Sequence, residues 1–323
     1  MKILVVGGAG YIGSICAEVL LDQKHDVAIF DNLSEGHRHA VDPRAEFIEG
    51  DLADREATAD ALGRLRPEAV MHFAANALVA ESMQNPSKYF RNNIANGLNL
   101  LDAMIAAEVR SLVFSSTCAT FGPPERLPID EETPQRPINP YGESKLGFEK
   151  ILRWYDAIHG LRFVSLRYFN AAGASENFGE DHRFETHLIP NVLKVALGQK
   201  SYVEIFGTDY ETPDGTCIRD YIHIIDLAHA HILALEAPAS AFYNLGTGGG
   251  SSVREVIASC RKITGQPIPT MEKPRRPGDP PRLIASSEKI KCELGWRPQF
   301  QALDAIVDSA WKWHQKFPRG YED

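Results

Sequence analysis

The stretch Gly7-Gly8-Ala9-Gly10-Tyr11-Ile12-Gly13 decides the fold of this chain. An apolar run, Ile3–Val6, precedes it and predicts a strand, and the segment after it, Ser14–Gln23, has the length and pattern of a helix. Glycines at such a junction let the backbone turn tightly and let a pyrophosphate approach the helix N-terminus. The GxxGxxG pattern therefore predicts a dinucleotide site at the start of a strand–helix–strand unit.

An acidic residue, Asp31, follows the second apolar run, Val27–Phe30. A carboxylate at this distance from the glycines accepts hydrogen bonds from the adenosine ribose and would repel a 2′-phosphate. The pattern therefore predicts NAD rather than NADP. The alternative is a glycine turn with an unrelated loop aspartate, which the strand–turn–helix context disfavours.

Short apolar runs alternate with helix-length segments through the first half of the chain, which predicts an α/β fold with a doubly wound parallel sheet, the Rossmann fold. The runs are also apolar enough for a sheet that is covered on both faces. The expected strands are Ile3–Val6, Val27–Phe30, Ala45–Ile48, Ala69–Phe73, Leu112–Ser115 and Phe163–Leu166, and the expected helices are Ser14–Gln23, Arg55–Leu65, Asn92–Ala107 and Gly142–His159.

This alternation breaks after Phe169, where Asn170–Arg183 is polar and rich in glycine. We expect an NAD-binding Rossmann domain over residues 1–169 and a smaller, mixed α/β substrate domain over residues 170–323. The helix-like Ile222–Leu235 and the strand-like Phe242–Leu245 are expected to bring residues 222–246 back onto the first domain.

Two further stretches follow predicted strands and are candidates for cofactor contacts. Asp51, after the third strand, could bind the adenine amino group, and a helix N-cap is an equally good interpretation of it. The small residues of Phe73-Ala74-Ala75 would let the cofactor lie close to the backbone, but they fit tight helix–sheet packing equally well.

The most informative pentapeptide is Tyr141-Gly142-Glu143-Ser144-Lys145. Tyr141 and Lys145 share one face of a helix because they are four residues apart. A nearby ammonium favours the phenolate, and the positive nicotinamide of bound NAD acts in the same direction, so we expect both to lower the pKa of Tyr141 and make it a proton acceptor near neutral pH. The hydroxyl cluster Ser115-Ser116-Thr117 ends the fifth predicted strand, where ligands bind in such sheets, and Thr117 could bond the same substrate oxygen. Capping of the strand end is the alternative for that cluster.

The chain resembles the UDP-glucose/UDP-galactose 4-epimerase family of the extended short-chain dehydrogenases/reductases. The resemblance runs from Met1 to about Trp313 and is carried by GGAGYIG, DNLSEG, HFAA, FSSTCATFG, NPYGESK, LRYFNAAGA, FGTDY, DGTCIRDYIHIIDLA, YNLGTG and RRPGD. It implies NAD-dependent 4-epimerisation of a UDP-sugar through a transient 4-keto intermediate, with Tyr141, Lys145 and Thr117 as catalytic residues. The cofactor-binding residues that it implies are Gly7, Gly10, Tyr11, Ile12, Gly13, Asp31, Asn32, Asp51, Leu52, Phe73, Ala74, Ala75, Asn92, Ser115, Tyr141, Lys145 and Tyr168.

The resemblance also implies a UDP-sugar site. Its residues are Thr117, Asn170, Leu188, Phe206, Arg219, Arg276 and Asp279. The arginines suit the diphosphate, Asp279 suits ribose hydroxyls, and Phe206 could stack on uracil. The alternatives are a surface ion pair for Arg219-Asp220 and a solvated basic turn for Arg275-Arg276.

Five positions depart from the family pattern. Thr117 stands where many relatives have serine, and it keeps the hydroxyl. Phe121 stands where tyrosine is common, Ala77 where some members have lysine, and His187 where asparagine is usual. Leu283 falls near the position that gates the sugar's 2-substituent and matches neither residue type expected there. UDP-glucose/UDP-galactose is the favoured pair, with UDP-xylose/UDP-arabinose or a UDP-N-acetylhexosamine as alternatives.

Other function classes fit less well. The segment Thr117-Cys118-Ala119-Thr120 lacks the carboxylates of sugar-nucleotide dehydratases and decarboxylases, and a non-catalytic dinucleotide sensor would often lose the Tyr–Lys pair. His223, Asp226, His229 and His231 lack zinc-site spacing, so no metal is expected.

Net charge, the length of apolar runs and the cysteine count limit the kinds of partner that the protein can have. A net charge of -9 argues against nucleic acid, and no apolar run approaches the roughly 20 residues of a membrane span. The 5 widely spaced cysteines indicate reduced thiols and a cytoplasmic location. The resemblance adds a homodimer that pairs through the helices after the fourth strand and at Tyr141.

Overall fold

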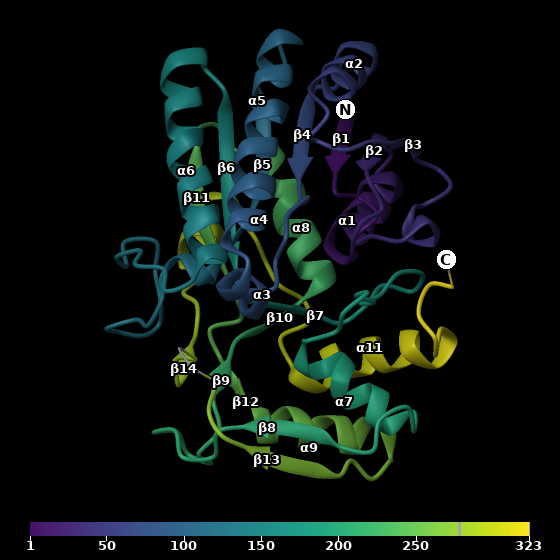
Figure 1. Ribbon diagram of the computed structural model, residues 1–323, viewed down its shortest axis with the longest axis vertical. Coiled ribbons are helices and arrows are strands. Elements are labelled where there is room, and N and C mark those ends of the chain that lie inside the picture. The colour runs from purple at the N-terminus through teal and green to yellow at the C-terminus, as the bar shows by residue number, and fades with distance from the viewer. Residues whose placement is uncertain (277–278, 323) are drawn as a thin grey trace.

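The computed structural model describes residues 1–276 and 279–322. Its centre is a seven-stranded sheet in the order β11-β6-β5-β4-β1-β2-β3, and all of its pairings are parallel (Figure 1). Strand order reverses between β1 and β4, as in the doubly wound dinucleotide-binding fold. The predicted fold class is therefore confirmed. The strands are β1 (Lys2–Val6), β2 (Asp26–Asp31), β3 (Glu46–Glu49), β4 (Ala69–His72), β5 (Ser111–Thr117), β6 (Arg162–Tyr168) and β11 (Ala241–Leu245).

Helices cover both faces of this sheet, which explains why its strands are apolar on both sides. One face packs on α1 (Tyr11–Asp22) and α8 (Ile224–Leu235), and the other on α2 (Arg55–Leu65), α5 (Gly97–Ala106) and α6 (Pro140–His159). Short helices α3 (Val79–Gln84) and α4 (Pro86–Phe90) follow β4, and a π-helical turn, Arg91–Asn96, leads into α5.

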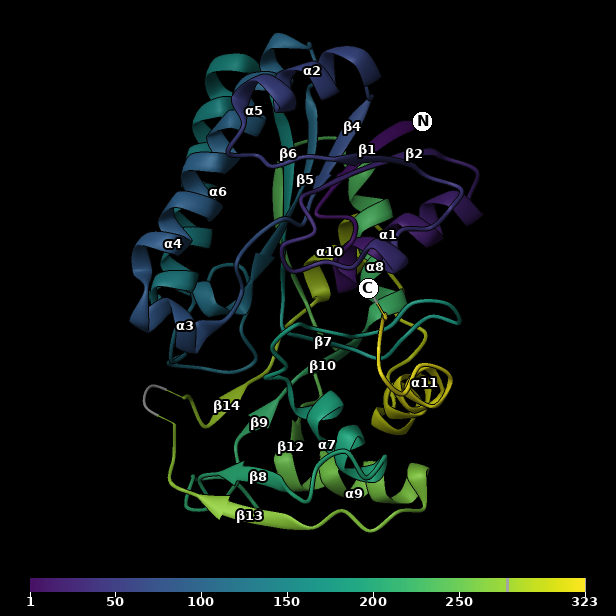
Figure 2. The same ribbon diagram turned by 45° about the vertical axis from the view of Figure 1, so that its right-hand side comes forward.

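The second part of the chain forms a smaller lobe below the sheet (Figure 2). Its helices are α7 (Leu188–Ala196), α9 (Val253–Thr264) and α11 (Leu303–Lys316), which share one apolar core with β8 and β10. The short strands are β7 (Asn170–Ala172), β8 (Val203–Phe206), β9 (Ile218–Arg219), β10 (Tyr221–His223), β12 (Ser251–Ser252), β13 (Thr270–Lys273) and β14 (Arg282–Leu283), and α10 (Glu288–Glu293) lies against β11.

Two segments of this second half contact the first. Strand β11 pairs with β6 along its whole length, and α8 packs on α1. The helix expected over Ile222–Leu235 begins only at Ile224, because Ile222 and His223 belong to β10, which pairs with β7. The division of the chain into domains at residue 169 stays a prediction.

Helix α1 also begins earlier than expected, at Tyr11 rather than Ser14, so the last glycine of the motif is inside its first turn. Among the described residues no helix is both long and apolar enough to cross a membrane.

Candidate active site

The glycine motif lies between β1 and α1, and two of its glycines are required by the chain's own packing. Gly7 has a φ of +80°, and a Cβ there would lie 2.4 Å from the Ala74 backbone nitrogen. A Cβ on Gly13 would lie 2.2 Å from the Gly7 carbonyl oxygen. These two residues therefore fix the tight turn between strand and helix.

Gly10 differs from them, because a Cβ there would meet only the Gly7 oxygen, at 3.6 Å. Its φ of -85° is open to any residue, and no side chain caps the α1 N-terminus. A glycine that the fold does not require, at an uncapped helix N-terminus, fits the close approach of a phosphate. The residues present thus suit the pyrophosphate of NAD.

Gly10 faces a cleft whose walls come from the ends of β1, β2, β3 and β4. Ten of the expected cofactor residues line it: Gly7, Gly10, Asp31, Asn32, Asp51, Leu52, Phe73, Ala74, Ala75 and Asn92. Ser34, Gly36, Gly50 and Asn76 also line it and were not predicted. Their signal in the sequence was their place in the same loops, just after Asp31, before Asp51 and after Ala75.

Two carboxylates expected to bind the adenosine part of the cofactor lie in this cleft. Asp31 accepts hydrogen bonds from the backbone nitrogens of Ala9, at 2.9 Å, and Leu33, at 2.8 Å, and burial raises its pKa. Asp51 accepts a bond from the Asn32 amide at 2.9 Å. The N-cap interpretation of Asp51 is wrong, because Asp54 caps α2.

Tyr11 does not line the cleft. Its hydroxyl donates a 2.6 Å hydrogen bond to the Gly173 carbonyl, which ties α1 to the loop after β7. Ile12 and Gly13 occupy the first turn of α1 without lining the cleft among the described residues.

The expected catalytic residues come from β5 and α6. Asn139 caps α6 and places Tyr141 in its first turn, close to Thr117 at the end of β5, whose hydroxyl acts to lower the pKa of Tyr141. One turn further, the Lys145 ammonium donates to the Ser115 carbonyl at 2.8 Å and lies 4.8 Å from the centre of the Phe114 ring. The Ser115 hydroxyl bonds with that of Tyr168. The predicted tyrosine, lysine and hydroxyl residues therefore converge at one strand end.

The electrostatics of the pair differ from the expectation. Burial raises the pKa of Tyr141 to about 12, and the hydrogen bond with Thr117 offsets this only in part. Burial also lowers the pKa of Lys145 to about 7, against the opposing attraction of Glu149. Lys145 is thus too desolvated to act as the strong cation that the sequence suggested, and the protein alone does not lower the pKa of Tyr141.

A buried ionic network beneath this pair was not predicted. Glu149, one further turn along α6, accepts hydrogen bonds from Ser116 at 2.7 Å, Ser165 at 2.8 Å and Gln135 at 3.1 Å. Arg167 on β6 donates to both Glu149 oxygens, at 2.7 Å and 2.9 Å. Within the Ser115-Ser116-Thr117 cluster, Ser116 therefore belongs to this network. Ser115 contacts Tyr168, and Thr117 contacts Tyr141.

Several expected UDP-site residues are also neighbours. Arg219 forms an ion pair with Asp279, and the Arg276 guanidinium lies 4.0 Å from the centre of the Phe206 ring. Asn170 and Leu188 begin β7 and α7. One face of Phe206 is thus covered by Arg276.

The alternative for Arg219-Asp220 is wrong. Asp220 is fully buried and accepts bonds from the backbone of Thr247, Gly248 and Ala285, so it is not the surface partner of Arg219. Arg275 and Arg276 are both exposed, so the solvated basic turn stays an alternative for them, although Arg276 also covers Phe206.

The residues weighed as metal ligands do not converge. Asp226 accepts from two backbone nitrogens, His223 bonds with Ser309, and His231 bonds with the Leu227 carbonyl.

Of the departures from the family pattern, Phe121 is buried in a small apolar cluster with Ile129, Phe169 and Ala285. Leu283 and Cys118, the residue after Thr117, both pack against that cluster. Leu283 therefore lies in the same region as the expected catalytic residue Thr117, whereas Ala77 is exposed.

Comparison with known proteins identifies this arrangement. The model of the NAD dependent epimerase/dehydratase family matches residues 3–246. The chain is 53% identical to the UDP-glucose 4-epimerase of Streptococcus mutans, covering 100% of this chain and 99% of that protein. It is 52% identical to the enzyme of the same name from Corynebacterium glutamicum, covering 96% and 95%.

Solved structures agree with the sequences. A crystal structure of UDP-glucose 4-epimerase matches with a TM-score of 0.98 and 49% identity, covering 100% of both chains. The Brucella ovis enzyme, in complex with NAD, has a TM-score of 0.93 and 47% identity over 96% of this chain and 97% of that one. The Bifidobacterium longum enzyme, in complex with NAD⁺ and UDP, has a TM-score of 0.95 and 39% identity over 99% and 100%.

Proposed function

Because this chain belongs to the NAD dependent epimerase/dehydratase family, and within it to the UDP-glucose 4-epimerases, we propose that its physiological reaction is the interconversion of UDP-glucose and UDP-galactose. The chain is an NAD-dependent enzyme that inverts C4 of a UDP-sugar. The roles of individual residues below are part of the proposal.

The observation that carries these roles is the contact of Tyr141 with Thr117 at the end of β5, above the buried Lys145. This group lies at the carboxyl edge of the same sheet that forms the dinucleotide cleft. A sugar bound at this edge would meet a phenol, a hydroxyl and the cofactor at one place.

Tyr141 takes the proton of the C4 hydroxyl, and Thr117 holds the same oxygen by a hydrogen bond. Bound NAD supplies the hydride acceptor for C4 and later the donor, and its positive ring favours the phenolate of Tyr141. The protein by itself raises the pKa of Tyr141, so the charge of the bound cofactor is needed to activate that phenol. Lys145, held by the Ser115 carbonyl, positions the nicotinamide ribose.

Inversion requires the 4-keto sugar to turn over while the nucleotide stays bound. Arg219 and Arg276 are the cations available for the diphosphate, and Asp279 and Asn170 supply polar contacts. Tyr141 then returns its proton to the C4 oxygen when the opposite face is reduced. The reaction therefore needs strong contacts with UDP and few contacts with the sugar, so that the sugar can turn over.

The test is turnover of a panel of UDP-sugars, with the products separated by chromatography. We expect UDP-glucose and UDP-galactose to interconvert fastest, and Tyr141→Phe to lose at least about 100-fold in turnover, because a positioned proton acceptor contributes that much. Tyr155→Phe is the matched control, since Tyr155 lies on the same helix and its hydroxyl donates to Asp102. Near-normal turnover by Tyr141→Phe would refute the assignment.

The same panel decides the sugar. Leu283, beside Cys118, leaves a UDP-N-acetylhexosamine as a second candidate, and one structural relative is named as a UDP-Glc/GlcNAc 4-epimerase from Campylobacter jejuni. A faster rate with UDP-N-acetylglucosamine or UDP-xylose would replace the glucose/galactose assignment.

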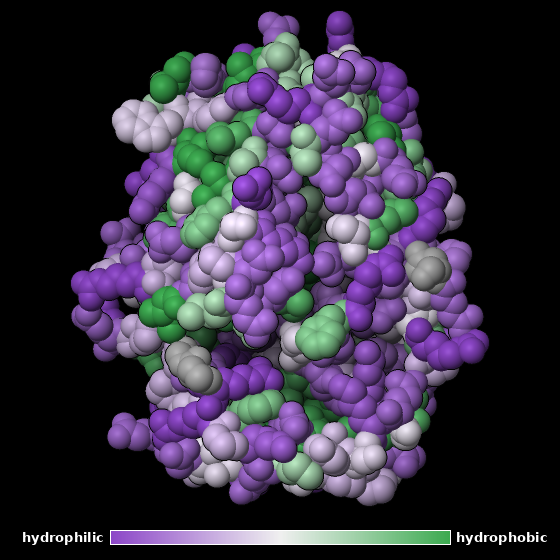
Figure 3. Space-filling model, viewed as in Figure 1, coloured by the Kyte–Doolittle hydropathy of each residue, from purple (hydrophilic) through white to green (hydrophobic). Residues whose placement is uncertain are grey.

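We also propose that the enzyme is a cytoplasmic homodimer. Its 5 cysteines are all free thiols, which suits a reducing compartment. Exposed apolar side chains on α6, Trp154 and Ile158, support pairing through that helix. Hydrophobic side chains gather over α5 and α6, at the upper left of Figure 3.

A further inference from the structure

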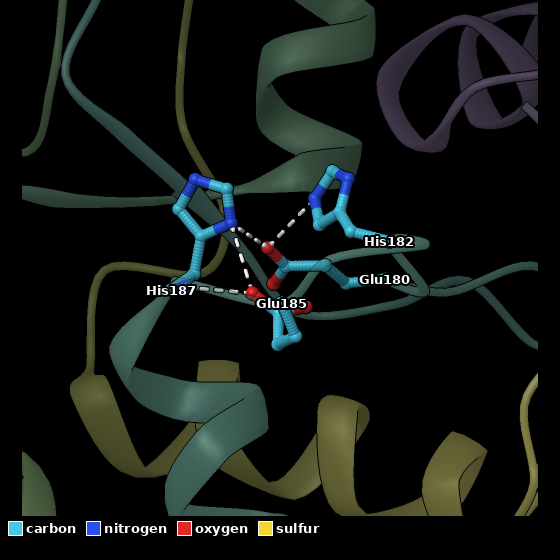
Figure 4. A group of neighbouring side chains, drawn as sticks. All are labelled: Glu180, His182, Glu185 and His187. Atoms are coloured by element: carbon cyan, nitrogen blue, oxygen red, sulfur yellow. Dashed lines mark hydrogen bonds and ion pairs between the residues drawn. The ribbon is translucent and has the colours of Figure 1, made fainter. Parts of the chain in front are cut away.

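Four potential ligands that have no role in the proposed reaction converge in the loop between β7 and α7. They are Glu180, His182, Glu185 and His187, and one ligand atom from each lies within 4.8 Å of the others (Figure 4). The sequence repeats itself there, as Glu-x-His, two residues, and Glu-x-His again. None of the histidines between residues 223 and 231, which were considered above as metal ligands, belongs to this group.

The carboxylates surround one imidazole nitrogen. His187 Nδ1 lies 3.0 Å from Glu180 Oε1 and 3.2 Å from Glu185 Oε1, and His182 Nε2 lies 3.3 Å from the same Glu180 oxygen. The Glu180 and Glu185 side chains are only 6% and 3% exposed. Two buried carboxylates so close together need a positive charge between them.

A protonated His187 supplies that charge only in part. Its ring nitrogen lies between both carboxylates, but one positive charge against two negative charges leaves a surplus of negative charge. In addition, Glu185 Oε2 is buried and has no hydrogen-bond partner among the described residues. Such an unsatisfied carboxylate oxygen is costly unless a further cation reaches it.

We propose that Glu180, His182, Glu185 and His187 bind one divalent first-row transition-metal ion, of which zinc is the type case. Two imidazole nitrogens and two carboxylate oxygens form a ligand set that zinc accepts. Bonds of about 2.0–2.1 Å place tetrahedral ligands roughly 3.4 Å apart, close to the three contacts above. The other separations in the group are at most 4.8 Å, so the ligands have to close by no more than about 1.4 Å.

The position of the site gives it a structural role. Its loop bonds to the dinucleotide half through Arg183, which donates to the Gly36 carbonyl at 3.0 Å, and through the bond from Tyr11 to Gly173. His187 immediately precedes α7, whose first residue, Leu188, is expected at the UDP site. No contact among the described residues joins the four ligands to Tyr141 or Lys145. The ion would therefore fix this loop and the start of α7 without taking part in the chemistry.

The experiment uses the full-length, NAD-loaded protein, stripped with a chelator and titrated with Zn²⁺ or Co²⁺ alone. We expect one ion per chain by elemental analysis, a weak visible d–d spectrum for Co²⁺, and a higher melting temperature with Zn²⁺. His182→Gln and Glu185→Gln should each weaken binding at least about 10-fold, since even partners of ligands cost that much. His159→Gln, an exposed histidine on α6, is the matched control and should bind as the unaltered protein does.

Failure to bind either ion, or equal binding by the ligand variants, would overturn the proposal. An intense cobalt–thiolate band would also overturn it, because it would place the ion on a cysteine such as the exposed Cys292. If Glu185→Gln does not fold, His182→Gln still tests the proposal. His182 is only partly buried, so its replacement should leave the protein folded. Epimerase turnover is recorded on the same samples, so the metal proposal and the proposed function fail separately.

Discussion

Glu149 supports the expected catalytic residues by contacts with their buried neighbours. It carries the buried ion pair with Arg167, both side chains being 2% exposed, and it holds Ser116, between Ser115 and Thr117. Removing one partner of a buried pair leaves the other charge uncompensated. The network therefore stabilises the strand end from which the hydroxyls project.

Glu149→Gln is expected to lower the free energy of unfolding by about 3–5 kcal/mol, because Arg167 would be left buried without a counter-charge. Denaturant unfolding measures this directly. Glu143→Gln, exposed on the same helix, is the control and should change stability by less than about 0.5 kcal/mol. A Glu149→Gln protein as stable as its control would show that the pair contributes nothing.

Lys145 gives the cofactor-free protein a characteristic pH dependence. Burial lowers its pKa from 10.5 to about 7, so between these values the unfolded chain holds a proton that the folded protein has lost. Stability therefore rises with pH in this window, by up to about 1.4 kcal/mol per pH unit. We expect Lys145→Met to lose this rise between pH 7 and about 9 in urea unfolding, whereas Lys150→Met, exposed on α6, keeps it. If the free energy of unfolding depended on pH in the same way for both variants, Lys145 would have to be charged in the folded protein.

The limits of sequence reasoning are plainest at this scale. The Tyr–Lys spacing placed both residues on one face of α6, and the structure agrees, since their helical phase is local. Their pKa values depend on burial, which no spacing reveals, and in the protein without its cofactor burial raises the pKa of Tyr141. Glu149 and Arg167 escaped notice because strand and helix bring them together only in three dimensions.

At the scale of elements, the turn between β1 and α1 contains glycines that are present for two different reasons. Gly7 and Gly13 are required by neighbouring backbone, whereas Gly10 has room for a side chain and faces the cofactor cleft. Replacement of Gly10 should therefore affect the cofactor and spare the fold.

Gly10→Ala is expected to keep the melting temperature of the cofactor-free protein and to weaken NAD binding at least about 10-fold, or about 1.4 kcal/mol. Calorimetric titration with NAD gives the affinity. Gly63→Ala, in α2 with no atom within 4 Å of the added carbon, should bind NAD normally. If Gly10→Ala bound NAD as tightly as Gly63→Ala, the pyrophosphate would not approach this residue.

Elements in the first half were predictable because apolar runs and helix-length segments alternate regularly there. The strands from β1 to β6 were each expected within a few residues of their observed bounds. In the second half the strands are two to five residues long, too short for a period to show. The strand β10 was therefore absorbed into the helix expected over Ile222–Leu235, and α3 and α4 were not expected.

At the scale of the whole molecule, the open question is how chains associate. Trp154 and Ile158 are 68% and 67% exposed, and their spacing of four residues puts them on one face of α6. Large exposed apolar side chains that cluster on a helix face are typical of an interface.

The double variant Trp154→Glu/Ile158→Glu is expected to shift the protein from a dimer of 35.8 kDa chains to a monomer, because charges would be buried in the interface. Light scattering after size exclusion gives the mass. Met271→Glu, on the exposed strand β13, is the control and should stay dimeric. A monomeric unaltered protein, or a dimer that tolerates both glutamates, would rule out this face.

The sheet is completed by a strand that the ribosome makes late. Strand β6 ends at Tyr168, but its outer neighbour β11 is not translated until residues 241–245. Until then the nascent chain exposes the free edge of β6, which is open to pairing with other chains. Maturation of the nucleotide-binding half must therefore wait for most of the other half to leave the exit tunnel, and cutting the gene between them would yield a fragment prone to aggregate.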